Sequence, residues 1–257
     1  MSSAYSGPIL DLKGISFRYG AGAPVVRDLS LALRQRELIG LLGANGSGKS
    51  TILKLAAGML RPERGSVVLW NKALADYANR DRAKLLCYLP QHLDASVPFT
   101  VREIVGMGLY PYEIPPVMSV DEALETVGLT DKAGSTVTAL SGGERRRVFL
   151  AMTLLQGAGV LLLDEPLANL DIRYQIEFLK LLHRLKETRG LSVVMALHDI
   201  NIALQFENVV LLKDGAVLGI GDPGDVLNGS MIRSAFGVQI EVRKAEHGSY
   251  ITHEKWV

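Results

Sequence analysis

The sequence lacks several features that define whole classes of protein. Its only cysteine is Cys87, so an intrachain disulfide is impossible, and we expect a buried free thiol in a reducing compartment. No apolar run approaches the roughly 20 residues that cross a bilayer, and the N-terminus shows no charged-then-apolar signal pattern. We therefore expect this chain to be made and kept in the cytosol.

An excess of charge of one sign is also lacking. The chain carries 28 basic and 27 acidic residues without a long run of either sign, so we expect no nucleic-acid partner. The five histidines have no metal-ligand spacing, and we expect no structural metal. The one short basic run, Arg145, Arg146 and Arg147, is interpreted as a solvated helix face.

What the sequence does contain is a glycine-rich loop between two regular elements. Residues 38–42 form an apolar run typical of a buried strand, and residues 52–56 continue at helical spacing until Gly58. Between them the pattern G-x-x-x-x-G-K-[ST] is matched by Gly43, Ala44, Asn45, Gly46, Ser47, Gly48, Lys49 and Ser50. Such a loop wraps phosphates with successive N–H groups, while the lysine neutralises phosphate oxygens and the serine offers its hydroxyl to Mg²⁺.

Two consecutive carboxylates follow a second apolar run. Residues 160–163 read as a buried strand, and Asp164 and Glu165 come directly after it. Neighbours on an extended backbone point to opposite sides, so Asp164 can face Mg²⁺ while Glu165 polarises a water in line with the γ-phosphate. A solvated turn would explain an acidic pair alone, but the phosphate loop favours catalysis.

The run Leu-Ser-Gly-Gly-Glu at residues 140–144 predicts the start of a helix that presents its end to an anion. Ser141 and Glu144 have the spacing of a capping box, and apolar residues continue at helical spacing beyond them. The first turn of a helix leaves N–H groups without partners, and Gly142 and Gly143 place no Cβ in front of them. Taken alone, an ordinary capped helix would explain the same residues.

The chain reads as one domain, residues 1–257, of the α/β class. Thr100 with Glu103 and Ser119 with Glu122 form two further capping boxes, which predict helices inserted between two blocks of strands. We predict a core of residues 1–92 and 158–237, an inserted helical subdomain of residues 93–157, and a closing hairpin of residues 238–257.

The phosphate loop, the Leu-Ser-Gly-Gly-Glu run and the Leu-Leu-Leu-Asp-Glu-Pro strand resemble, in this order, the ATP-binding cassette (ABC) family of ATPases. The resemblance covers nearly the whole chain. It implies a P-loop NTPase core with a mixed sheet, an N-terminal antiparallel β-subdomain and an inserted helical subdomain. It also implies hydrolysis of ATP with Mg²⁺ by two copies paired head to tail, each ATP lying between one copy's phosphate loop and the other copy's residues 141–143.

Site residues are carried over from the family by matching positions. The catalytic positions are Glu165, His198, Gln91 and Lys49, and those that would contact Mg²⁺ are Ser50, Gln91 and Asp164. Nucleotide contacts fall on Tyr19, Gly43, Ala44, Asn45, Gly46, Ser47, Gly48, Lys49, Ser50, Thr51, Ser141, Gly142 and Gly143. Read without the family, Tyr19 could cap a small sheet, Gln91 could be a surface amide and His198 could be structural.

The sequence departs from the family at two positions. Ala44 stands where many relatives carry proline, and we expect phosphate binding to survive because that side chain makes no phosphate contact. Asn169 replaces the usual serine or histidine of the loop that contacts the second copy. Neither change removes a catalytic group.

An ATPase without a visible phosphoryl acceptor drives motion in another molecule. Residues 99–111 and 237–242 resemble importer subunits for iron(III)-siderophore, haem or cobalamin. This resemblance implies a peripheral protein at the cytoplasmic face of the inner membrane. Its partners would be a second copy, permease subunits and, indirectly, a periplasmic or extracellular substrate-binding protein. A zinc or manganese importer ATPase and a soluble ABC ATPase outside transport are the alternatives.

Overall fold

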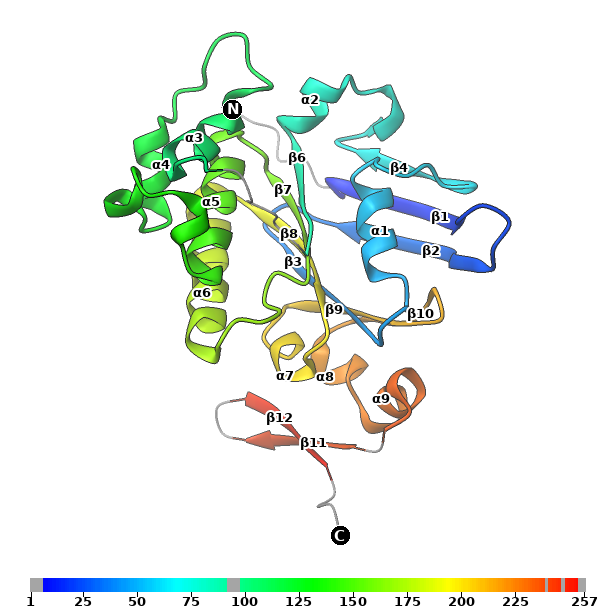
Figure 1. The fold of residues 1–257 in the computed structure, drawn as a ribbon. Helices are drawn as coiled ribbons and strands as arrows, with labels where there is room; N and C mark the ends of the chain where they lie inside the picture. Colours follow the sequence, from blue (N-terminus) through cyan, green and yellow to red (C-terminus); the bar gives the residue numbers. More distant parts are fainter. Residues whose placement is uncertain (1–6, 92–97, 239, 246–247, 254–257) are drawn as a thin grey trace.

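The computed structural model describes residues 7–91, 98–238, 240–245 and 248–253, arranged as two large sheets and a two-stranded hairpin, with helices between and beside the large sheets (Figure 1). The smaller sheet has four antiparallel strands in the order β2-β1-β4-β5. These strands are β1 (Leu10–Arg18), β2 (Pro24–Leu33), β4 (Arg64–Leu69) and β5 (Lys72–Ala73). This sheet is the predicted N-terminal antiparallel β-subdomain.

The larger sheet is mixed, as predicted. Its six strands follow the order β10-β9-β3-β8-β7-β6, and only β10 runs antiparallel to its neighbour. They are β3 (Leu38–Gly43), β6 (Leu86–Leu89), β7 (Val160–Asp164), β8 (Ser192–Leu197), β9 (Asn208–Lys213) and β10 (Ala216–Gly221). Because β3, β7 and β8 are parallel neighbours, the residues that follow all three meet at one edge of the sheet.

Helix α1 (Lys49–Ala56) lies between the two sheets (Figure 1). Successive side chains of a strand point to opposite faces, so the central strands contribute to two separate cores. Ile39 and Leu41 pack with α1 and the antiparallel sheet, whereas Leu38 and Leu42 pack with the helices beyond the other face. Both faces of β3 are fully buried, which explains its unbroken apolar run.

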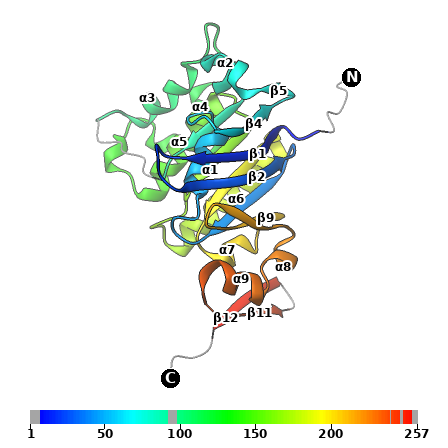
Figure 2. The same cartoon turned by 90° about the vertical axis from the view of Figure 1, so that its right-hand side faces the viewer.

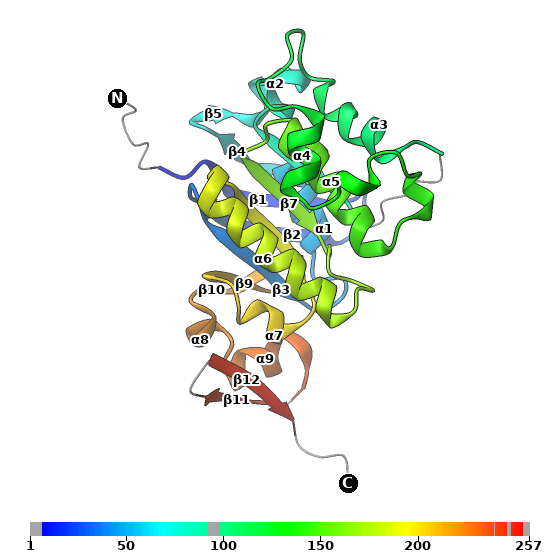
Figure 3. The ribbon, with the colours of Figure 1, turned by 90° about the vertical axis from the view of Figure 1, so that its left-hand side faces the viewer.

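A group of helices covers the second face of the mixed sheet (Figure 3). Its members are α3 (Val101–Gly106), α4 (Val120–Thr126), α5 (Gly142–Leu155) and α6 (Ile172–Arg189), with 3₁₀ turns at Met107–Leu109, Thr130–Lys132 and Val137–Ala139. The capping boxes at Thr100, Ser119 and Ser141 are all formed, which confirms the three predicted helix starts. The first three helices come between β6 and β7, as an insertion requires; the boundaries 93 and 157 stay predictions.

Short elements complete the chain. They are a 3₁₀ turn at Leu74–Asp76, then α2 (Asn79–Ala83), α7 (Ile200–Ala203), α8 (Pro223–Val226) and α9 (Gly229–Phe236). The closing hairpin is confirmed: β11 (Ile240–Ala245) pairs with β12 (Gly248–His253) beyond α9 (Figure 2). Gln239 and His247, which belong to the predicted hairpin of residues 238–257, lie outside the described residues. None of the described helices is both long and apolar enough to cross a membrane.

Two local expectations are wrong. Asp199 is a good N-cap, and the sequence predicts a helix from Ile200 to Phe206; in the structure this helix, α7, ends at Ala203, because the chain turns there to enter β9. The basic run is not a solvated face: Arg145, Arg146 and Arg147 are half-buried. Each guanidinium donates to a backbone carbonyl, of Leu140, Ala168 and Val127 respectively. These arginines therefore tie the start of α5 to the loops around it.

Candidate functional site

The phosphate loop turns tightly between β3 and α1. Gly48, the N-cap of α1, has φ +100°, a conformation that side chains other than glycine rarely adopt. A Cβ at Gly43 would lie 2.6 Å from Ser47 Oγ and 2.7 Å from the Leu212 carbonyl oxygen. Both positions therefore require glycine, one for its conformation and the other for space.

Lys49, the first residue of α1, folds back over this loop. Its side chain is only 5 % exposed, and Nζ donates to the carbonyl oxygens of Gly43 at 2.8 Å and Ala44 at 3.4 Å. Nζ also lies 3.6 Å from Glu165 Oε1. The ammonium is thus held inside the loop, close to where a phosphate chain would enter.

The loop fits an anion by what it leaves unpaired. No side chain caps the first turn of α1, so the N–H groups there are free to bind an anion. Ser47 Oγ is buried and has no hydrogen-bond partner among the described residues. Buried polar atoms are nearly always paired in native proteins, so this orphaned oxygen and the uncapped helix end together fit a bound phosphate.

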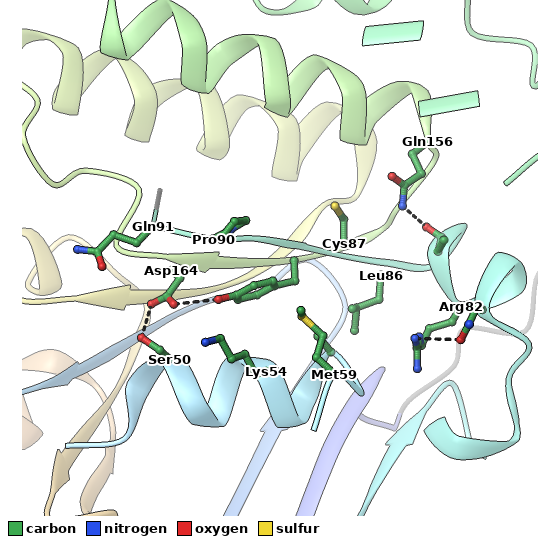
Figure 4. Close-up of a pocket in the computed structure, with 14 residues that line it drawn as sticks. Ser50, Lys54, Met59, Arg82, Leu86, Cys87, Pro90, Gln91, Gln156 and Asp164 are labelled. Atoms are coloured by element: carbon green, nitrogen blue, oxygen red, sulfur yellow. Dashed lines mark hydrogen bonds between the residues drawn. The ribbon is translucent and has the colours of Figure 1, made fainter. Parts of the chain in front are cut away.

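The residues predicted to contact Mg²⁺ are brought together around Asp164. Ser50 Oγ donates to Asp164 Oδ1 at 2.9 Å, and the Tyr88 hydroxyl donates to Asp164 Oδ2 at 3.0 Å. A carboxylate and a hydroxyl are oxygen donors of the kind Mg²⁺ prefers, so the residues fit this ion. Ser50, Gln91 and Asp164 also line one end of a pocket of about 650 Å³, in which Figure 4 shows Ser50 beside Asp164.

Tyr88 stays protonated beside this carboxylate. Burial raises the pKa of its phenol, and the negative charge of Asp164 raises the pKa further. We missed this residue from the sequence. The available signal was a hydroxyl in the otherwise apolar strand that leads to Gln91.

Glu165 lies at the centre of the predicted catalytic residues. Gln91 Nε2 donates to Glu165 Oε2 at 2.9 Å, and His198 Nδ1 lies 3.9 Å from the same oxygen. Together with Lys49, these residues form one cluster at the carboxyl ends of the parallel strands. Glu165 and Asp164 do face different partners, but our reason was incomplete: Glu165 has φ +47° and begins a turn, so its backbone is not extended.

His198 follows β8 and points one side of its ring to solvent. Its side chain is 53 % exposed. The next residue, Asp199, caps α7 by accepting from the N–H groups of Asn201 at 2.8 Å and Ile202 at 3.4 Å. The cap fixes the backbone beside His198 and leaves its imidazole free to contact a ligand.

Tyr19 lies on the other side of α1, just after β1. Its ring packs edge-on against Phe17 with centroids 4.9 Å apart, and its hydroxyl lies 3.3 Å from Thr51 Oγ1. Half of the side chain remains exposed. Tyr19 therefore both covers the end of the small sheet and leaves a ring face open beside the phosphate loop.

The Leu-Ser-Gly-Gly-Glu helix start is not part of this cluster. Its helix, α5, packs on the face of the mixed sheet opposite to α1 (Figure 1). Ser141 and Gly142 are exposed, while Gly143 is buried against the ring of Tyr174. Ser141 Oγ donates to Glu144 Oε2 at 2.8 Å, and hydrogen bonds from the Ser141 backbone N–H and hydroxyl lower the pKa of Glu144.

Asn169 lies in the loop between Glu165 and α6. Its φ is +60°, a conformation that asparagine adopts more readily than most residues. The departure from the family at this position therefore suits the local turn.

The comparisons with known proteins agree with this geometry. Residues 26–168 match the family described as ABC transporter. The hemin import ATP-binding protein HmuV of Rhodopseudomonas palustris (strain BisB18) is 40 % identical over 249 residues, which cover 93 % of this chain and 92 % of HmuV. The petrobactin import ATP-binding protein FpuD of Bacillus anthracis is 35 % identical over 241 residues, 91 % of this chain and 88 % of FpuD.

Solved structures show the same fold. A metal-chelate-type ABC transporter in an inward-facing conformation superposes with a TM-score of 0.80 at 24 % identity, covering 95 % of this chain and 96 % of that one. The dimeric ATP-binding cassette MJ0796 bound to ADP and Pi superposes with a TM-score of 0.72 at 26 % identity, covering 83 % and 98 %. This chain therefore belongs to the ABC transporter family, and its fold is that family's ATP-hydrolysing domain.

Proposed function

We propose that this chain powers the uptake of an iron chelate, a siderophore complex or haem, by hydrolysing MgATP in a dimer. One observation carries the chemical part: Lys49, Gln91, Glu165 and His198 converge beside the Ser50–Asp164 pair within a single chain. The relatives named for hemin and petrobactin import support the cargo.

Phosphate binding falls to the loop and the start of α1. The uncapped N–H groups of α1 and the buried ammonium of Lys49 bind the phosphates, and the loop carbonyls keep that ammonium in place. The open face of the Tyr19 ring stacks on adenine. Ser50, Gln91 and Asp164 would hold Mg²⁺, which would neutralise the charge of the phosphate oxygens.

Water activation falls to Glu165. Its carboxylate orients the attacking water and accepts its proton, while Gln91 and His198 hold the carboxylate and the γ-phosphate in line. In this structure Gln91 Nε2 donates to Glu165, whereas Mg²⁺ would be bound through the other atom of the amide, the oxygen Oε1.

The helix start at residues 141–143 completes the site of a second copy. Ser141 and Gly142 are exposed and uncharged, and α5 lies on the opposite face of the mixed sheet from α1, which suits a contact made across a dimer interface. Each ATP would then lie between two subunits and hold them together until it is hydrolysed.

We place the dimer at the cytoplasmic face of the inner membrane, bound peripherally to permease subunits. A periplasmic or extracellular binding protein would deliver the chelate to that permease. The cargo is not read by this chain, because the permease and binding protein select it.

A growth experiment tests the proposal. A strain without this gene should fail to grow on haem or a ferric siderophore as sole iron source. Wild-type protein should restore growth, and a Lys49→Ala variant should not. Normal growth on both iron sources with failure under zinc or manganese limitation would contradict the iron assignment and favour a zinc or manganese importer.

A further inference from the structure

Asp164 receives hydrogen bonds from two different elements. Ser50 Oγ on α1 donates to Oδ1 at 2.9 Å, and the Tyr88 hydroxyl on β6 donates to Oδ2 at 3.0 Å. The carboxylate itself is buried, with 4 % of the residue exposed. Each of its oxygens therefore has its own donor.

The sheet register explains why Tyr88 can reach this carboxylate. Tyr88 pairs with Leu162 on the neighbouring parallel strand, and Asp164 lies two residues beyond Leu162 on the same face of β7. The long tyrosine side chain extends diagonally across that step. Tyr88 packs with the same core cluster that holds α1 in place, so its ring is fixed on the side of Ser50.

We infer that Tyr88 is a positioning residue that locks the orientation of the Asp164 carboxylate for Mg²⁺. The terminal torsion of an aspartate is soft and broad, so one donor on one oxygen leaves the group free to rotate. Two donors on opposite oxygens fix its plane and leave the remaining lone pairs aimed at a constant point. Donors of this kind behind a ligand typically contribute 10–100-fold in metal affinity.

The inference rests on the proposed MgATP site and adds a residue to it. Tyr88 acts in this inference through Asp164, to which its hydroxyl donates, and is not itself assigned as a ligand. Loss of the Tyr88 hydroxyl should have a selective effect. Mg²⁺ should strengthen nucleotide binding less than in the wild type, whereas nucleotide binding without Mg²⁺ should stay the same.

Tyr88→Phe removes the hydroxyl and keeps the ring. The measurement is the binding of a fluorescent, non-hydrolysable ATP analogue to the full chain, in EDTA and across a Mg²⁺ titration. We expect unchanged affinity in EDTA and about a tenfold higher Mg²⁺ concentration at half-effect. In ATPase assays the Mg²⁺ requirement should rise similarly, while kcat at saturating Mg²⁺ stays within about twofold.

Tyr77→Phe is the matched control. The Tyr77 hydroxyl donates to the backbone carbonyl of Leu69 at 2.9 Å, so this variant loses a phenol hydrogen bond without touching Asp164. It should leave the Mg²⁺ titration unchanged. Thermal melts of both variants report any loss of fold.

Three results would be decisive. An equal loss of affinity with and without Mg²⁺ in Tyr88→Phe would show a structural role only and overturn the inference. An unchanged titration in Tyr88→Phe would overturn it too. If instead Mg²⁺ failed to strengthen binding to the wild-type chain, the proposed MgATP site itself would be wrong.

Discussion

The phosphate loop and the Leu-Ser-Gly-Gly-Glu helix start are both glycine-containing helix N-termini, yet they differ in burial and in hydrogen-bond partners. Ser47 and Lys49 of the loop are buried, and Lys49 and Asp164 already have protein partners. At the helix start Ser141 and Gly142 are exposed, and the Ser141 hydroxyl is bonded to Glu144 of its own first turn. One region is preformed within the chain; the other is a surface feature, which in the proposed dimer would act on the nucleotide of a second copy.

This difference fits the proposed nucleotide site, which is shared between two copies of the chain. The half that holds the charged groups is built from the ends of four parallel strands, β3, β6, β7 and β8, and from α1, because the surrounding core limits the access of water. The half that would contact a second copy lies on the helical group. There Ser141 and Glu144 form a capping box at the start of α5.

The largest effect is expected from Glu165→Gln. The variant keeps the size of the side chain and its contact with Gln91 but cannot accept a proton, so turnover should fall about a thousandfold. ATP should still bind, and the ATP-bound dimer should persist in size-exclusion chromatography. Normal hydrolysis would show that the preformed half does not contain the catalytic base.

Mixed dimers test whether the two halves come from different subunits. Lys49→Ala disables a loop and should weaken nucleotide binding by about a hundredfold, while Ser141→Arg blocks a helix start. A dimer with one change in each subunit keeps one intact site, whereas a dimer with both changes in the same subunit keeps none.

The readout is the number of ATP molecules trapped per dimer in a Glu165→Gln background. We expect one for changes in different subunits and none for both changes in one subunit. The opposite pattern would mean that each chain completes its own site.

A smaller effect separates capping from anion binding. Ser141→Ala and Ser119→Ala each break a capping box and should each lower the free energy of unfolding by about 1 kcal/mol. Only Ser141→Ala should also reduce ATPase activity. Equal activity of the two variants would indicate that the Ser141 hydroxyl serves the helix alone.

The smallest expected effect concerns Cys87, which lines the pocket beside the loop. Burial raises the pKa of this thiol to about 12, so less thiolate is present at any working pH than in the unfolded chain. Alkylation at pH 8 should be at least about a hundredfold slower in the nucleotide-free protein than in urea. Fast labelling without nucleotide would show that the loop half is not preformed.

Local patterns predicted most of the fold correctly. Apolar runs identified β3 and β7, and three serine or threonine capping boxes marked α3, α4 and α5. These features depend on residues within a few positions of each other. The end of α7 and the environment of the three arginines after Glu144 were wrong, because both depend on where the chain packs next.

The candidate site shows the same division. Lys49, Ser50, Asp164 and Glu165 were predicted from motifs, and the structure places them together. Tyr88 was missed because its hydrogen bond to Asp164 depends on the register of β6 against β7, which no local sequence pattern contains.

The sequence by itself determined the phosphate loop, the acidic strand end and the capped helix starts, since each is a short-range pattern of backbone donors, turns and charge. Only the tertiary structure decided which of them meet. Parallel pairing carried Gln91, Glu165 and His198 to one sheet edge around Lys49, and it turned the Ser141 helix start to the opposite face. Long-range strand order and register, set by burial of both sheet faces, made one half-site complete and left the other exposed.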